Sequence, residues 1–153
     1  MARYEIVDLT LDCDTGGLAA GDVLCATQSL GNTSAGVLES CELINLDDKT
    51  TGIILYFMSA NASIGAEDAA FSPSDTAVVT FLTRLNFASG SWIDHTNSLY
   101  QIKTAAAGDA GMGTYLISDA PSTSAAVYVG AVANATGTFT VNGLRLRVGL
   151  RLD

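Results

Sequence analysis

Hydrophobic and polar residues alternate with a period of two along much of this 153-residue chain, and helical periodicity is scarce. The clearest alternation closes the chain, where leucine or valine occupies every even position from Leu144 to Leu152. The odd positions of the same segment include Arg145, Arg147 and Arg151. As a strand this segment has one apolar face and one basic face. The pattern predicts that the apolar face packs in a core and that the arginines lie outside it.

Other segments share this alternation or have the β-branched and aromatic content that is typical of strands. The segment Ile53–Met58 is continuously apolar, which indicates a strand that is covered on both faces. The sequence therefore predicts an all-β fold, a compact antiparallel β-sandwich or barrel. We expect strands at residues 4–11, 23–28, 37–46, 53–58, 84–88, 98–104, 114–118, 126–132 and 138–141, and in the closing segment.

One short helix is expected near residues 73–82, in "SPSDTAVVTFL". Ser72 is placed to cap its N-terminus, Pro73 suits the first helical position, and Asp75 suits the first turn. The β-branched run that follows limits the helix to about two turns.

Turn signals organise the rest of the chain as one domain, residues 1–153, with residues 1–11 as an N-terminal strand or arm. The Gly- and Ala-rich residues 105–113 predict a flexible loop. Asn142 and Gly143 lie between alternating segments, and this dipeptide is typical of a type I′ turn, in which both residues have positive φ. We therefore expect a closing hairpin over residues 136–152.

The charge balance and the apolar runs exclude several classes of partner. The formal net charge is −9, whereas binding to nucleic acid requires a clustered basic surface. No apolar run approaches the roughly 20 residues of a membrane helix. The first ten residues have no signal-peptide pattern, so synthesis in the cytoplasm is expected. These features predict that the protein binds neither nucleic acid nor membrane.

The three cysteines are Cys13, Cys25 and Cys41. Their number is odd, no two of them form a CxxC pair, and a zinc site usually needs about four ligands in close pairs. We expect three reduced cysteines that act as small buried hydrophobic residues.

No catalytic, cofactor or metal site is predicted, and no cofactor is expected. His95 is the only histidine, and "SWIDHTN" places it in a loop. The carboxylate pairs Asp12/Asp14 and Asp47/Asp48 fall where aspartate is typical of turns. The run from Asp12 lacks the spacing of a calcium loop. We therefore predict that the protein is not an enzyme.

Several segments resemble small decoration (cement) proteins of tailed-phage capsids, of the β-tulip type. The likeness lies in "AAGDVL", in "AGVLESCELINLDDKTTGIILYFMSANAS", in "AFSPSD", in "SWID" and in "AAVYVGAVANATGTFTVNGLRLRVGL". It covers most of the chain as an order of segments. The resemblance implies a β-tulip-like domain without catalytic residues. It further implies a protein of the virion, made in the host cytoplasm and located on the outer capsid surface. Such proteins are often homotrimers, and they bind the major capsid protein and stabilise contacts between its subunits.

Two other functions remain open on the sequence alone. A tail or head–tail structural component would have the same composition. A carbohydrate-binding β-sandwich would need an exposed aromatic platform, for which Trp92 and Tyr100 are the candidates.

The residues expected at a subunit or capsid interface are Arg3, Tyr4, Arg145, Arg147 and Arg151. Two interpretations of the three C-terminal arginines stay open. In the first, they pair with carboxylates of a neighbouring strand or subunit, and Gly149 marks a bulge. In the second, they meet an acidic surface of the capsid, so that reversing the charge of both Arg145 and Arg147 weakens assembly more than folding.

Overall fold

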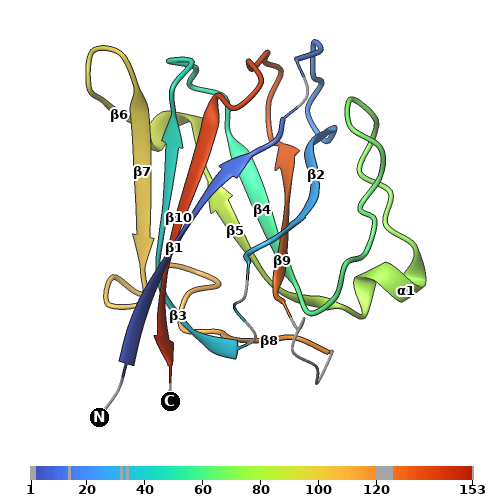
Figure 1. The fold of residues 1–153 in the computed structure, drawn as a ribbon. Helices are drawn as coiled ribbons and strands as arrows, with labels where there is room; N and C mark the ends of the chain where they lie inside the picture. The colour runs from blue at the N-terminus through green and yellow to red at the C-terminus, as the bar shows by residue number, and fades with distance from the viewer. Residues whose placement is uncertain (1–2, 14, 32, 34, 120–125, 153) are drawn as a thin grey trace.

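Two antiparallel β-sheets pack face to face in the computed structural model, which describes residues 3–13, 15–31, 33, 35–119 and 126–152 (Figure 1). One sheet has the strand order β1–β10–β3–β7–β6, and β8 pairs with the start of β3; the other has the order β2–β9–β4–β5. The prediction of an all-β antiparallel sandwich with one short helix is confirmed. The elements are β1 (Arg3–Leu11), β2 (Val23–Ser29), β3 (Ala35–Asn45), β4 (Ile53–Met58), α1 (Asp75–Val78), β5 (Phe81–Phe87), the 3₁₀ turn η1 (Ser89–Ser91), β6 (Ile93–Asp94), β7 (Leu99–Thr104), β8 (Tyr115–Ile117), β9 (Tyr128–Ala133) and β10 (Leu144–Leu152).

The closing strand β10 lies inside the six-stranded sheet, between β1 and β3. Its even residues from Leu144 to Leu150 are buried, and Leu152 is half-buried. They face the core side chains of the second sheet, among them the fully buried Phe57 and Phe87. The predicted division of this strand into an apolar face and a basic face is confirmed.

The segment between β4 and β5 covers the side of the four-stranded sheet that points away from the core, and it forms a small hydrophobic cluster there. Ile64 of this segment and Met58 of β4 are fully buried. The ring of Tyr56 stacks on Phe71, with 4.7 Å between the centroids, and also contacts Phe81. This cover explains the apolar residues on both faces of β4 that the sequence shows.

The helix is shorter than expected and begins later. Ser74, not Ser72, caps it: the Ser74 hydroxyl accepts a hydrogen bond from the backbone N–H of Ala77, at 3.2 Å. The chain enters β5 at Phe81, inside the range expected to be helical. The β-branched residues after Ala77 favour the extended backbone, and pairing with β4 outweighs another helical turn.

The predicted closing hairpin does not occur, because residues 138–141 form no strand and β10 pairs with β1 and β3. The turn is displaced by one residue: the N–H of Gly143 donates to the carbonyl of Thr140, and only Asn142 has positive φ, at 62°. Positive φ at the third residue alone is typical of a type II turn. The Asp47 carboxylate accepts hydrogen bonds from the backbone and hydroxyl of Thr140, at 2.8 and 2.5 Å. A side chain at position 143 would collide with this carboxylate.

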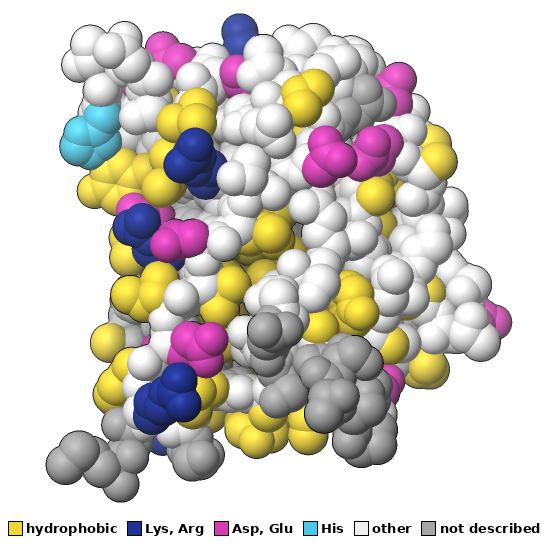
Figure 2. All heavy atoms as spheres, viewed as in Figure 1, with side chains coloured by type: hydrophobic (Ala, Val, Ile, Leu, Met, Phe, Trp, Pro, Cys, Tyr) yellow, Lys and Arg dark blue, Asp and Glu magenta, His cyan; other side chains and the backbone are white. Residues whose placement is uncertain are grey.

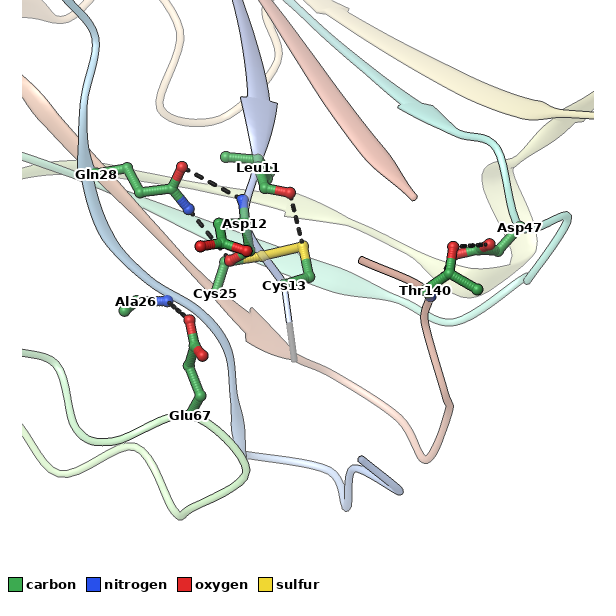
Figure 3. The surroundings of a disulfide bond; sticks show 9 residues. All are labelled: Leu11, Asp12, Cys13, Cys25, Ala26, Gln28, Asp47, Glu67 and Thr140. Carbon is green, nitrogen blue, oxygen red and sulfur yellow. Dashed lines mark hydrogen bonds between the residues drawn. A yellow bond between two sulfur atoms is a disulfide. The ribbon is translucent and has the colours of Figure 1, made fainter. Parts of the chain in front are cut away.

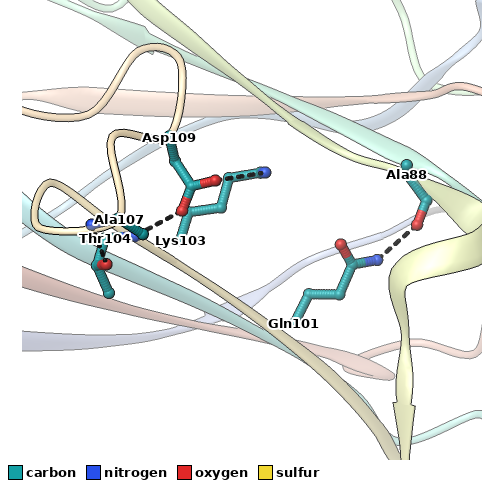
Figure 4. Close-up of polar contacts among 6 residues, drawn as sticks. All are labelled: Ala88, Gln101, Lys103, Thr104, Ala107 and Asp109. Carbon is teal, nitrogen blue, oxygen red and sulfur yellow. Dashed lines mark hydrogen bonds and ion pairs between the residues drawn. The ribbon is translucent and has the colours of Figure 1, made fainter.

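The Gly- and Ala-rich residues 105–113 form successive turns between β7 and β8 that hydrogen bonds fix to the sheets. Asp109 accepts a hydrogen bond from the N–H of Thr104 and lies 3.7 Å from the ammonium of Lys103 (Figure 4). The N–H of Gly113 donates to Leu38 of β3, and the hydroxyl of Thr83 on β5 donates to Gly111. The loop is thus connected to both sheets.

We expect Gly111→Ala to destabilise the fold by more than about 2 kcal/mol, since it combines a left-handed backbone with a steric collision. Gly111 has φ +87°, and a Cβ there would collide with the carbonyl oxygen of Arg84. Gly108 is the matched control, because its φ is +72° and no atom lies within 4 Å of its Cβ position. Urea unfolding should show a clearly larger loss for Gly111→Ala than for Gly108→Ala. Equal losses would mean that the collision is relieved at no cost.

The prediction of three reduced cysteines is wrong, because Cys13 and Cys25 form a disulfide bond (Figure 3). Cys13 follows β1 and Cys25 lies on β2, so the bond connects the two sheets, with 4.4 Å between the Cα atoms. The pairing arises from the way the chain crosses between sheets, which residue spacing does not reveal. Cys41 is free and buried.

Candidate protein-binding face

The side chains of the six-stranded sheet that point away from the core form what we call the outer face. Alternation along β1 and β10 places Ile6, Asp8 and the three arginines of β10 on it. Strands β3 and β7 contribute mainly Glu39, Glu42, Ile44, Tyr100 and Ile102. The face therefore contains a row of arginines on a central strand, with acidic and apolar residues on both sides.

Arg147 is paired with acidic residues of both neighbouring strands. Its Nε donates to Asp8 of β1 at 2.7 Å, and its Nη1 donates to Glu42 of β3 at 3.4 Å. The hydrogen bond to Asp8, and then the attraction of the two carboxylates, raise the pKa of the Arg147 guanidinium above its ordinary value. This arginine thus connects three strands.

Arg151 is paired across a β-bulge. The register between β10 and β3 shifts after Gly149, which leaves Glu39 as the extra residue of β3. The Nε of Arg151 donates to this Glu39 at 2.8 Å. The Ser40 side chain occupies the position that a Cβ at residue 149 would need. The predicted bulge at Gly149 is confirmed, as is the pairing of Arg147 and Arg151 with carboxylates of a neighbouring strand.

Arg145 differs from the other two arginines. Its cross-strand neighbours are Thr10 on β1 and Ile44 on β3, neither of which carries a charge. Among the described residues it forms no ion pair. It lines a hollow of about 240 Å³ in the outer face.

Exposed hydrophobic side chains surround the charged row. Tyr4 and Ile6 of β1 are 69% and 68% exposed, and Ile102 of β7 is 51% exposed. In Figure 2 dark-blue and magenta groups lie together on the side of the molecule formed by this sheet, with yellow groups between them. The outer face thus combines apolar area with charges, as protein interfaces do.

The five residues expected at an interface do not all lie together. Tyr4 pairs with Arg151 on the outer face. Arg3 pairs with Leu152 and alternates onto the other side of β1. Residues 3–11 are an ordinary edge strand of the sheet, so within the described residues they are not a detached arm. Ile6 and Ile102 were not predicted, because β1 and β7 have apolar residues on both faces.

The residues considered for chemistry are engaged in local structure. His95 is exposed in a loop, where its ring lies 5.0 Å from that of Tyr100. Trp92 is partly buried, and its Nε1 donates to the carbonyl of Thr51 at 3.1 Å, so it is not an open platform for a sugar. In the described part of the chain, no cluster of three or more His, Cys, Asp or Glu side chains could bind a metal. Asp14 lies outside the described residues.

The other aspartates singled out in the sequence lie in turns or in contacts between segments. Asp47 holds the turn at Thr140, and Asp48 has a positive φ of 54°. The backbone of Asp12 exchanges two hydrogen bonds with the Gln28 side chain.

None of the helices in the described ranges has the length and apolar character that a membrane span requires.

Comparison with known proteins gives structural similarities only. No family model matches the chain, and no curated protein matches it. The chain is similar to one from Desmodium yellow mottle tymovirus, with TM-score 0.36 and 12% identity over 99% of this chain and 81% of that one. A chain of the cyanophage Pam1 capsid asymmetric unit has TM-score 0.35 and 19% identity, over 99% of this chain and 85% of that one. A chain of Tomato aspermy virus has TM-score 0.42 and 8% identity, over 98% of this chain and 76% of that one. These scores and identities are too low to assign a shared function.

Proposed function

We propose that this protein is a structural component of a virus particle, which binds the outer surface of a tailed-phage capsid and stabilises contacts between major capsid subunits. The observation that carries the proposal is the outer face of the six-stranded sheet. It presents exposed apolar side chains around a row of arginines, on a rigid two-sheet scaffold. The segment resemblance to capsid decoration proteins supports the same assignment.

The physical properties of the chain suit a protein that binds the repeating subunits of a capsid. A protein that contacts several capsid subunits at once needs only modest affinity at each contact, because the first contact raises the effective concentration for the others. Apolar area supplies binding energy, and the charged row fixes orientation. The ion pairs of Arg147 and Arg151 hold β10 to both neighbouring strands, so the face keeps its shape when it binds.

We further propose that the protein assembles as a homotrimer. Exposed apolar side chains occur at several positions around the sheet, including Tyr115 and Ile117 on β8, which are 48% and 47% exposed. Contact between copies would cover part of this area. Light scattering after size-exclusion chromatography should give a mass of about three chains, and a monomer at all concentrations would contradict it.

Binding to capsids is the direct test of the function. The chain should co-sediment with purified capsids of the virus that encodes it, if these are prepared without it. Cryo-electron microscopy of the decorated particles should show density between neighbouring capsid subunits on the outer surface. Decorated particles should also withstand heating better than bare ones. Density at the neck or tail alone would instead identify a head–tail or tail component.

A further inference from the structure

The guanidinium of Arg145 forms no ion pair with a carboxylate of its own chain, within the described residues. Arg145 and Arg147 occupy equivalent positions, two residues apart on the same side of β10. The neighbours of Arg147 across β1 and β3 are Asp8 and Glu42, whereas those of Arg145 are uncharged. The positive charge of Arg145 is therefore available to another molecule.

Arg145 also lies in a hollow, which a partner side chain can enter. The hollow of about 240 Å³ is lined by β1, β3 and β10, through Asp8, Leu9, Thr10, Ile44, Arg145, Leu146 and Arg147. Since one water takes about 30 Å³ in the liquid, this volume holds a carboxylate side chain with some water. Two guanidinium groups and one carboxylate line the hollow, and the carboxylate of Asp8 is paired with Arg147, so the charge of Arg145 leaves the hollow with one positive charge in excess.

We propose that the hollow around Arg145 receives a carboxylate from an aspartate or glutamate side chain of the major capsid subunit. This inference rests on the proposed function. A guanidinium binds a carboxylate through two parallel hydrogen bonds, which fixes both position and direction. Arg145 then sets the register of the protein on the capsid, while Arg147 and Arg151 are used within the sheet.

The surrounding charges favour a single carboxylate as the occupant. A nucleic-acid backbone requires several free cations, whereas Arg147 and Arg151 on the same face are already paired with Asp8, Glu42 and Glu39. A second copy of this chain is the alternative source of the carboxylate, and the measurement of self-association below distinguishes it from the capsid subunit.

Capsid binding of single variants tests the inference. Arg145→Ala should weaken co-sedimentation with undecorated capsids by about tenfold or more, because a charge-assisted bidentate contact is lost. The Arg145→Lys variant should bind capsids with an affinity between those of the wild type and Arg145→Ala, since an ammonium group lacks the planar geometry that allows two parallel hydrogen bonds. Arg84→Ala is the matched control: it removes the same charge from an exposed arginine of β5, in the other sheet, and should bind like the wild type.

The outcomes separate this inference from the proposed function. A wild-type chain that fails to bind capsids overturns the function and the inference together. Wild-type binding that Arg145→Ala leaves unchanged overturns the inference alone. Equal losses for Arg145→Ala and Arg84→Ala indicate a general charge effect and overturn it, as does a loss of self-association without a loss of capsid binding. Equal melting temperatures of the variants and the wild type show that the change lies in binding.

Discussion

Replacing Phe57 with alanine is expected to destabilise the protein by about 3–5 kcal/mol, a large part of the stability of a typical domain. Phe57 is fully buried on β4, which lies between β9 and β5, and its ring packs between the two sheets. Its removal opens a cavity that neighbouring strands cannot close, because each is held by its own ladder of backbone hydrogen bonds. Urea unfolding followed by intrinsic fluorescence or circular dichroism measures the loss.

The control removes apolar atoms from the surface. Val79, which follows α1, is 82% exposed, and Val79→Ala should change the free energy of unfolding by about 0.5 kcal/mol or less. A Phe57→Ala variant as stable as Val79→Ala would show that the two sheets do not pack around the Phe57 ring.

Reduction of the Cys13–Cys25 disulfide should lower the stability of the fold by about 3 kcal/mol. The bond closes a short loop, since the two cysteines are 12 positions apart, and it restricts the unfolded chain accordingly. For a domain of this size the melting temperature should fall by roughly 6–12 °C when a reductant is added. The double variant Cys13→Ser/Cys25→Ser should melt at the lower temperature with and without reductant.

Cys41 provides the control for this experiment. Burial raises the pKa of its thiol well above the ordinary value, an effect that the nearby Lys103 only partly opposes. Cys41 should therefore resist alkylation in the native state and react after unfolding. A Cys41→Ala variant should keep the full response to reductant. The absence of any response in the wild type would contradict a structural role for the disulfide.

Local patterns in the sequence were sufficient to predict the fold class and most strands. The alternation of leucine and arginine in β10 is visible in the sequence because one face is entirely buried. The turn at Asn142 lies one residue before the predicted position. Asp47, which is distant in sequence, accepts hydrogen bonds from Thr140 and leaves no room for a side chain at position 143. The disulfide was missed for the same physical reason: Cys13 and Cys25 meet only after the chain has crossed from one sheet to the other.

The candidate site was predictable in its residue types but not in its pairings. The sequence places three arginines on one side of β10, but it does not show which strands lie beside them. Strand order assigns Asp8 and Glu42 to Arg147, and the bulge assigns Glu39 to Arg151. Both depend on the register between strands far apart in the chain. Arg145 could be distinguished from its neighbours only once that register was known.

The position of β10 between β1 and β3 also affects how the protein folds during its synthesis. Among the strands of the described residues, β1 pairs with β10 alone, and Arg3 lies opposite Leu152. Until β10 has emerged from the ribosome, β1 has no strand to pair with and one edge of β3 stays open. Contacts between such distant residues form slowly. The six-stranded sheet is therefore completed only when β10 is available, and until then its open edges are the part of the chain most exposed to association with other chains.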